Sequence, residues 1–301
     1  MFVSKRNLSR YSLFQIPLVC FTICSIAALL FALLGLGRPQ VAVGVVLDLS
    51  SSTYGSTFNA PGTVMAQSVG AVRAYLQANA QLRQPNQVQV WGMRGRKAPK
   101  LTNDLSANSQ EVEVALQKAI KGLNPLTLPE VPGQDDLNVP VRAAMRSFSN
   151  LSGGCREVLV VSDAGVEIKE STVAEAVANR TKLNFLVFGN QEAPELQDAA
   201  KATRGIYSFN GQGDLSQLFI DTFFKQFNSN LGWILFWLGA AWIALMWTLV
   251  LPLDRWVFQG YWKLPMDLAA KLALANALFW TTAIPGILWR FMGGLPFFSS
   301  C

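Results

Sequence analysis

The sequence contains no histidine, and this absence excludes several classes of enzyme at once. Ser-His-Asp and Cys-His nucleophile systems, histidine-bound zinc and the usual general base all need an imidazole. The chain also lacks the G-x-x-x-x-G-K-[ST] and G-x-G-x-x-G patterns that cradle phosphates. These absences favour a protein that is not an enzyme.

Charged residues are also scarce, at 15% of the 301 residues against 51% hydrophobic residues, a balance typical of membrane proteins. No charge occurs between Arg10 and Arg38 or between Lys225 and Asp254, and both gaps can cross a hydrocarbon core of about 30 Å as helices. The first apolar run is too long for a signal peptide, so we expect an uncleaved anchor. A third gap, 272–289, contains Pro285 and Gly286 and fits either a third helix or a re-entrant or interfacial hairpin.

The formal net charge of +6 is concentrated beside these apolar segments. Residues 1–37 carry three basic and no acidic residues, residues 38–230 carry 18 basic against 17 acidic, and residues 231–301 carry four against two. Because positive residues mark the cytoplasmic side, we expect a cytoplasmic N-terminus and anchor (1–37), a periplasmic or lumenal domain (38–230) and two C-terminal membrane segments (231–301). The host would be a bacterial inner membrane or a thylakoid-type membrane. The charge distribution predicts no nucleic-acid partner.

The domain at 38–230 alternates strand-like and helix-like patterns. "VAVGVVLDL" (41–49) and "EVLVVSD" (157–163) are continuous apolar runs typical of fully buried strands, and stripes at helical spacing separate such runs. "QVQVWGM" (87–93) and "APKLTNDLS" (98–106) predict a hairpin around a basic turn, which is either a solvated tip or an acid-binding patch. The predicted fold class is therefore α/β, a doubly wound and mostly parallel sheet, with two to three transmembrane helices.

Two of the buried runs end on an aspartate, Asp48 and Asp163, and Ser50 and Ser52 follow the first. If the two strands are neighbours, these oxygens meet at the carboxyl edge of the sheet, where such folds bind ligands. The resulting pocket of hard oxygen atoms suits Mg²⁺. Alternatively, the serines are loop or helix-capping residues.

In the order of its elements the region resembles the von Willebrand factor type A (vWA) domain, over nearly all of residues 40–228. The metal-ion-dependent adhesion site of that family opens with D-x-S-x-S, which Asp48, Ser50 and Ser52 match, and Asp163 in "VSDAG" matches its later aspartate. The resemblance implies a protein-interaction module that holds a divalent cation, Mg²⁺ first and Mn²⁺ or Ca²⁺ as alternatives. Similar bacterial membrane proteins work beside MoxR-type ATPases, but a domain outside the cytoplasm would not meet a cytoplasmic ATPase.

One position departs from the family pattern. The family has a metal-binding threonine where the stretch "GQDDL" has Asp135. Thr127 is an alternative ligand. Asp135 also has an explanation without metal, because the dipole of a helix favours acidic residues before its first turn. A third carboxylate would over-neutralise a dication and reduce the gain from an acidic partner. The expected metal ligands are Asp48, Ser50, Ser52, Asp135 and Asp163.

Three functions fit these patterns. The first is a membrane-anchored module that binds a protein partner, within a membrane complex, through a metal-bearing rim. The second is a metal-independent accessory or assembly subunit that docks through its membrane helices. The third, a phosphoryl-transfer enzyme with Asp48 as nucleophile, is disfavoured because Ser50 replaces the acid/base aspartate of D-x-D-x-T enzymes.

Overall fold

The computed structural model describes residues 12–54, 60–123, 136–151, 153–163, 165–189, 192–210 and 214–292. The chain divides into two compact units, one formed by Pro39–Asn228 and the other by Met1–Arg38 together with Ser229–Cys301. Each unit is described in turn.

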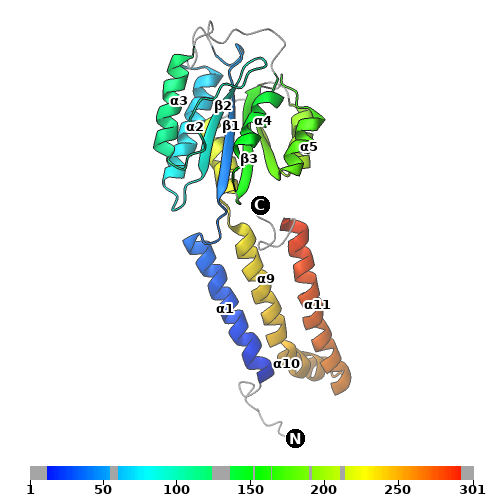
Figure 1. The fold of residues 1–301 in the computed structure, drawn as a ribbon. Helices are drawn as coiled ribbons and strands as arrows, with labels where there is room; N and C mark the ends of the chain where they lie inside the picture. Colours follow the sequence, from blue (N-terminus) through cyan, green and yellow to red (C-terminus); the bar gives the residue numbers. More distant parts are fainter. Residues whose placement is uncertain are drawn as a thin grey trace. The chain divides into compact units, whose positions relative to one another are not determined.

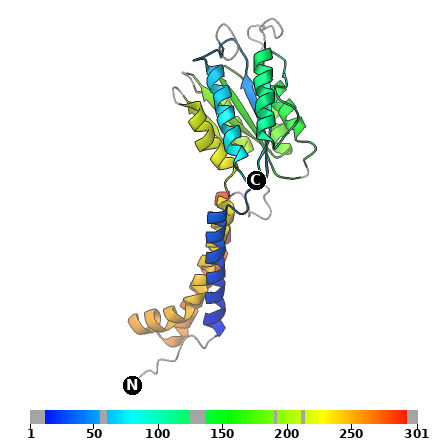
Figure 2. The same ribbon diagram turned by 90° about the vertical axis from the view of Figure 1, so that its left-hand side faces the viewer.

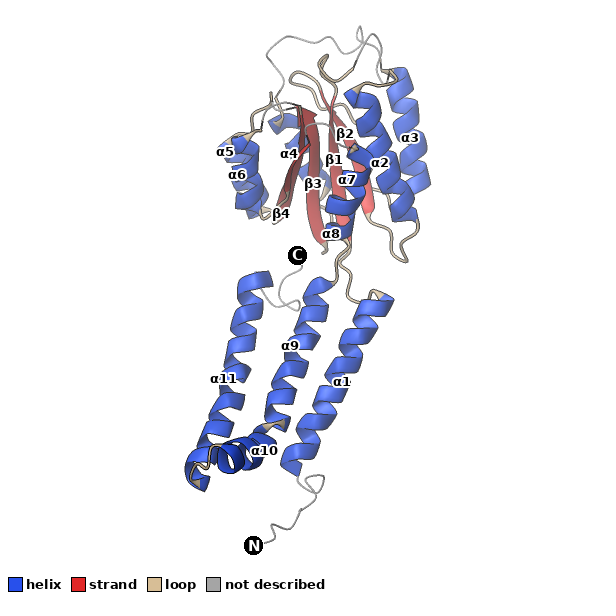
Figure 3. Ribbon diagram, turned by 180° about the vertical axis from the view of Figure 1, so that it is seen from behind, coloured by secondary structure: helices blue, strands red, loops and turns tan. Residues whose placement is uncertain are grey.

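The first unit is built on a five-stranded sheet in the order β2-β1-β3-β4-β5, in which every neighbouring pair is parallel (Figure 3). The strands are β1 (Val41–Asp48), β2 (Gln87–Met93), β3 (Cys155–Asp163), β4 (Thr181–Phe188) and β5 (Tyr207–Asn210). β2 lies on one side of β1 and β3 on the other, so the direction of winding reverses between β1 and β3. This reversal is the topological switch point at which parallel sheets leave a crevice. The predicted α/β class is confirmed.

Helices cover both faces of the sheet (Figure 1). One face carries α2 (Val64–Ala80), α3 (Ser109–Gly122), α7 (Leu215–Leu218), the π-helical turn η2 (Phe219–Phe224) and α8 (Lys225–Phe227). The other face carries α4 (Asn138–Ser147), α5 (Glu170–Ala178) and α6 (Pro194–Thr203). All eight residues of β1 are buried, as expected for a strand covered on both faces.

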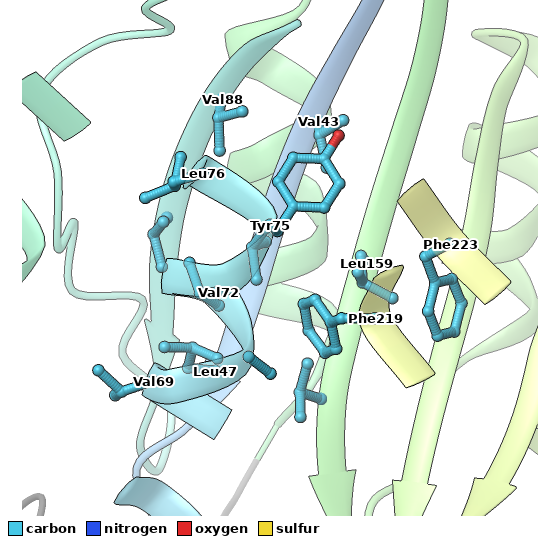
Figure 4. Close-up of a cluster of buried hydrophobic side chains, with 14 of the residues drawn as sticks. Val43, Leu47, Val69, Val72, Tyr75, Leu76, Val88, Leu159, Phe219 and Phe223 are labelled. Atoms are coloured by element: carbon cyan, nitrogen blue, oxygen red, sulfur yellow. The ribbon is translucent and has the colours of Figure 1, made fainter. Parts of the chain in front are cut away.

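The core on the α2 face is formed by alternate residues of the strands and by the aromatic side chains of the last helical segment. Figure 4 shows Val43 and Leu47 of β1 with Tyr75 of α2, beside Phe219 and Phe223. Fully burying a side chain of this size contributes about 1.5–3 kcal/mol. The core thus fixes β1 between two helical layers and fixes the position of its carboxyl end.

The last helical segment of this unit, Leu215–Phe227, is interrupted by the π-helical turn η2. Phe219, Phe223 and Phe227 are spaced four residues apart, and all three are buried. In a regular helix a spacing of four residues drifts about 40° around the axis at each step. The wider π turn offsets this drift, so all three rings stay on the buried side.

A polar group lies inside the sheet at Glu157 of β3, whose side chain is almost fully buried. Its carboxylate accepts a hydrogen bond from Asn184 Nδ2 at 2.9 Å and lies 3.4 Å from Lys182 Nζ. Burial raises the pKa of Glu157 above its ordinary value of 4.5, and the attraction of Lys182 only partly offsets the effect. The folded state therefore holds the proton of Glu157 more tightly than the unfolded state does.

This buried acid predicts a pH dependence of stability. The contribution of Glu157 to the free energy of unfolding should be largest below about pH 4.5 and should decline as the pH rises through the raised pKa. In Glu157→Gln this decline should disappear, as measured by urea unfolding with pulse proteolysis between pH 4 and pH 8. An identical pH slope in the wild type and the variant would contradict the assignment.

The second unit contains three helices that are long and apolar enough to cross a membrane, with candidate spans Phe14–Leu34, Leu231–Tyr261 and Met266–Phe291. Its elements are α1 (Ser12–Leu34), α9 (Leu231–Thr248), α10 (Val250–Pro252), the π-helical segment η3 (Leu253–Tyr261) and α11 (Met266–Met292). α11 is continuous through Pro285, so the helix interpretation of 272–289 holds and the hairpin interpretation does not. The segment η3 runs across the direction of α1 and α9 (Figure 2).

Hydrogen bonds and ring packing join the end of α1 to the start of α9, where the chain leaves this unit and returns to it. The side-chain amide of Asn230 donates to the carbonyl oxygens of Phe31, at 2.7 Å, and Leu36, at 2.9 Å. The rings of Phe31 and Trp233 pack with their centroids 5.6 Å apart. Asn230 thereby satisfies carbonyl groups at the end of α1 that have no partner within the helix.

Candidate metal centre

Asp48 is the last residue of β1, and its carboxylate lies at the switch point. β1 and β3 pair in parallel up to Leu47 and Val161, so Asp48 comes next to Ser162. Ser162 Oγ donates to Asp48 Oδ2 at 2.6 Å, and the backbone N–H of Ser50 donates to Asp48 Oδ1 at 2.9 Å. Asp48 is 4% exposed, and both donors are neutral. These two bonds use only part of the acceptor capacity of a carboxylate.

The loop after β1 brings two hydroxyl groups together. Ser50 Oγ and Ser52 Oγ lie 2.9 Å apart. Neighbouring ligands of an octahedral Mg²⁺, each about 2.1 Å from the metal, are about 3.0 Å apart. The same distance also fits the hydrogen bond that the two hydroxyls form here. The spacing is therefore compatible with a shared cation, and the oxygen chemistry fits a hard dication.

Thr53 holds this loop in shape. It is 2% exposed, and its hydroxyl contacts the carbonyl oxygens of Asp48, at 3.0 Å, and Ser50, at 2.8 Å. Its backbone N–H also donates to Ser50 O, and the N–H of Met65 donates to Thr53 O. Thr53, considered from sequence as an edge of the rim or a solvent-facing residue, is instead a buried residue that fixes the turn.

The remaining predicted ligands are only partly described. Asp163 ends β3, the strand beside β1, and pairs with Phe188 of β4; its side chain lies outside the described part of the chain. Asp135 and Thr127 also lie outside the described residues. Where side chains are described, no three Asp, Glu, Cys or His groups gather around one point. Because Asp135 and the Asp163 side chain lie outside the described residues, this absence does not test the predicted set.

Asp136, the neighbour of Asp135, is engaged at the start of α4. Asp136 Oδ1 accepts hydrogen bonds from the backbone N–H of Asn138, at 2.9 Å, and from its side-chain amide, at 2.6 Å, and Asp136 Oδ2 lies 3.6 Å from Lys169 Nζ. Burial raises the pKa of Asp136, but these donors and the ammonium of Lys169 outweigh it and lower the pKa overall. Asp136 therefore serves the helix start.

A buried arginine lies beside the same loop. Arg94, which follows the last residue of β2, is 3% exposed. Its Nη1 donates to the carbonyl oxygen of Leu49 at 2.8 Å and to the hydroxyl of Tyr54 at 2.9 Å, and its Cζ lies 5.3 Å from the centre of the Tyr54 ring. Arg94 lies in the turn of the predicted hairpin; residues 98–106 form no strand and contact β2 only through isolated antiparallel bridges, such as that between Trp91 and Lys100. Its burial corrects the expectation of a wholly solvated basic turn, while Arg96 and Lys97 at the tip are exposed.

The sequence did not predict a role at the site for two residues, Ser162 and Arg94. Ser162 is polar within an otherwise apolar strand and directly precedes Asp163, which is a signal that a register argument could have used. Nothing in the sequence separates Arg94 from the other basic residues of its turn, because its role depends on contacts with residues 40–45 positions away.

Comparisons with known proteins give a fold and no closer relationship. No protein-family model and no curated protein sequence matches the chain. Among solved structures, an aerotolerance-related membrane protein from Bacteroides fragilis is 14% identical, with a TM-score of 0.47, over 62% of this chain and 99% of that one. A von Willebrand factor type A protein from Catenulispora acidiphila is 15% identical, with a TM-score of 0.47, over 65% of this chain and 43% of that one.

A third similar structure is proximal thread matrix protein 1 from the mussel byssus, described with a zinc-occupied MIDAS motif. It is 13% identical, with a TM-score of 0.47, over 64% of this chain and 46% of that one. At these identities the likeness concerns the fold alone. The parallel sheet in the order β2-β1-β3-β4-β5, with Asp48 and its serines at the switch point, is the arrangement that the sequence resemblance implied. The chain combines a parallel α/β domain with three helices long and apolar enough to cross a membrane.

Proposed function

We propose that this protein is a membrane-anchored interaction module that holds a divalent cation at the carboxyl edge of its sheet and binds a protein partner there. The observation that carries the proposal is the pair of hydroxyls, Ser50 Oγ and Ser52 Oγ, 2.9 Å apart beside the Asp48 carboxylate at the switch point. A carboxylate and two hydroxyls at this spacing form part of an oxygen shell for Mg²⁺. No catalytic step is assigned to these residues.

The proposed ligand set is Asp48, Ser50, Ser52, Asp163 and Asp135. Support for Asp163 comes from the parallel pairing of β1 and β3, whose carboxyl ends meet at one edge. Asp135 is proposed from its place in the sequence alone. When bound, the cation would supply a positive centre able to attract a carboxylate or carbonyl oxygen of a partner. With three carboxylates in the chain, that attraction is weaker than at a site with two.

Calorimetry on the full chain in detergent tests the cation directly. We expect heat of binding with Mg²⁺ or Mn²⁺ at one site per chain, and Ca²⁺ and Zn²⁺ belong in the same series, Zn²⁺ because the mussel protein is described with zinc. Partner capture from solubilised membranes should fall when a chelator is present. If no cation gives heat and the same partner is captured with chelator, the metal-independent role is the correct one.

One observation favours that second role, an accessory or assembly subunit without a metal. Hydrogen bonds from Thr53, Ser162 and Arg94 already hold Asp48 and Leu49, where β1 passes into the loop. In this alternative the domain is a scaffold, and the partner contacts come from the membrane helices. Asn276 of α11 and the small residues of α9 and α11 suit such helix packing.

The side of the membrane follows, in this proposal, from the basic residues. Lys5, Arg6 and Arg10 precede the first span; Arg255 lies in the last turns of the second candidate span, and Lys263 lies between the second and third spans. Both flanks suit the cytoplasm, so the domain would face the periplasm or a lumen. A protease added to the non-cytoplasmic side of sealed membranes should then cleave the domain. Protection from that side, with cleavage from the other, would reverse the orientation.

A further inference from the structure

The guanidinium of Arg94 is a buried cation placed against the loop that carries the proposed metal ligands. It reaches two points of that loop, the carbonyl oxygen of Leu49 before Ser50 and the hydroxyl of Tyr54 after Ser52. The two contacts bracket the serine pair. A buried charge of this kind is tolerated where hydrogen bonds satisfy it, and the two contacts with this loop supply part of that satisfaction.

The backbone fixes Arg94 to the loop independently of its side chain. Met93 pairs with Asp48 in the β1–β2 register, so Arg94 is one position beyond the level of the Asp48 carboxylate. The N–H of Leu49 donates to Met93 O at 2.9 Å, and Arg94 exchanges backbone hydrogen bonds with Lys97 across the turn. The N–H of Asp136 donates to Gly95 O at 2.9 Å, which fastens the same turn to the start of α4. The guanidinium is therefore held rigidly near the carboxyl edge.

We propose that Arg94 acts as a built-in cation of this rim: it holds the start of the β1–α2 loop, residues 49–54, in place when no metal is bound, and its charge lowers the affinity of the rim for a dication. The inference rests on the proposed function, because it concerns the same site. The guanidinium adds a positive charge beside Asp48, Ser50 and Ser52, the described members of the proposed ligand set. Without Arg94 the same rim would attract a dication more strongly. The rim would then depend on its metal to stay closed.

The side chain has two separable effects, a tether through its hydrogen bonds and an electrostatic effect through its charge. Lysine keeps the charge but cannot reproduce the planar, multidentate geometry of arginine. Glutamine keeps polar hydrogen bonding but removes the charge. A comparison of Arg94→Lys with Arg94→Gln therefore isolates the charge, and Tyr54→Phe removes one hydrogen bond of the tether while retaining the aromatic ring.

The test measures Mg²⁺ affinity by calorimetry on full-length protein in detergent, together with thermal stability in the presence of chelator. Arg94→Gln should bind Mg²⁺ at least about 10-fold more tightly than Arg94→Lys, a difference of about 1.4 kcal/mol. Arg94→Gln should also gain more thermal stability from Mg²⁺ than the wild type does. Tyr54→Phe should keep a Mg²⁺ affinity close to that of the wild type. Equal or weaker binding by Arg94→Gln than by Arg94→Lys overturns the proposal.

Failure of the inference and failure of the proposed function give different results. If the wild type binds Mg²⁺ and Arg94→Gln binds no more tightly than Arg94→Lys, the metal function stands and the role of Arg94 fails. If the wild type takes up no metal but Arg94→Gln does, the cation role of Arg94 stands and metal binding by the natural protein fails. If neither binds, both fail.

A measurement on the wild type alone covers the case in which a variant does not fold. Hydrogen exchange of the loop amides, including Thr53 N–H bonded to Ser50 O at 3.0 Å, should differ by less than about 10-fold between Mg²⁺ and chelator. Loss of protection of these amides in chelator would show that the metal, and not Arg94, keeps the loop closed.

Discussion

Replacing Asp48 with asparagine is expected to weaken Mg²⁺ binding about 100-fold or more, equivalent to about 2.7 kcal/mol. Asp48 is the one proposed carboxylate ligand whose side chain is described, and the substitution removes its charge with almost no change of shape. The amide oxygen of asparagine can still accept the Ser50 N–H. Its NH₂ group can donate to Ser162 Oγ, so we expect the loop to remain folded. Calorimetry with Mg²⁺ on the full chain measures the effect.

The matched control for this change is Asp198→Asn on α6. It removes the same charge from a side chain that is 78% exposed and paired with Lys201 on its own helix. This variant should bind Mg²⁺ as the wild type does, because an exposed charge is screened by solvent. Equal weakening in both variants would mean that the affinity depends on overall charge and that Asp48 is no ligand.

Replacing Gly205 with alanine is expected to destabilise the vWA-like domain by about 3–5 kcal/mol. Gly205 lies between α6 and β5, and its N–H donates to Ala200 O at 2.8 Å, which closes the end of α6. A Cβ at this position would overlap the carbonyl oxygen of Leu183 and lie 2.6 Å from its carbonyl carbon. These are backbone atoms of β4, so they cannot move aside without disturbing the sheet. Pulse proteolysis in urea measures the loss.

Gly122→Ala is the control for this prediction. Gly122 ends α3, and a Cβ there would meet no atom within 4 Å. Alanine favours a helix over glycine by up to about 1 kcal/mol, so this variant should be neutral or slightly more stable. A destabilisation of similar size at both positions would indicate that the effect belongs to the loss of glycine flexibility and not to the contact with Leu183.

The fold could be predicted from sequence because its signals are local. The strands at 41–49 and 157–163 contain the continuous apolar runs Val41–Leu47 and Val158–Val161, and the helices show regular stripes such as Val112, Leu116 and Ile120, which the structure buries. The membrane spans depend on length and composition alone. Each of these features lies within a short stretch of chain, so one sequence is sufficient to detect it.

The site was predictable only in part, because its geometry depends on strand register and long-range contacts. The D-x-S-x-S pattern indicated Asp48, Ser50 and Ser52, and the structure brings the two serine hydroxyls into contact beside the aspartate. The contact of Ser162 with Asp48 joins residues 114 positions apart and requires β1 and β3 to be neighbours in a known register. The roles of Asp135 and Asp163 as ligands remain predictions.

The hydrogen bonds of Asn230 have a consequence for the thermodynamics of the domain inserted between α1 and α9. Because they fasten the two helices at the points of departure and return, the 190 residues of Pro39–Asn228 form a closed ring even when they are unfolded. A ring of this length has a lower conformational entropy than an open chain. This raises the free energy of the unfolded state by about 5 kcal/mol at 25 °C if the closure is as firm as a covalent cross-link. The membrane helices thus stabilise the domain through its denatured ensemble, and detergents that separate α1 from α9 should lower its melting temperature without touching its core.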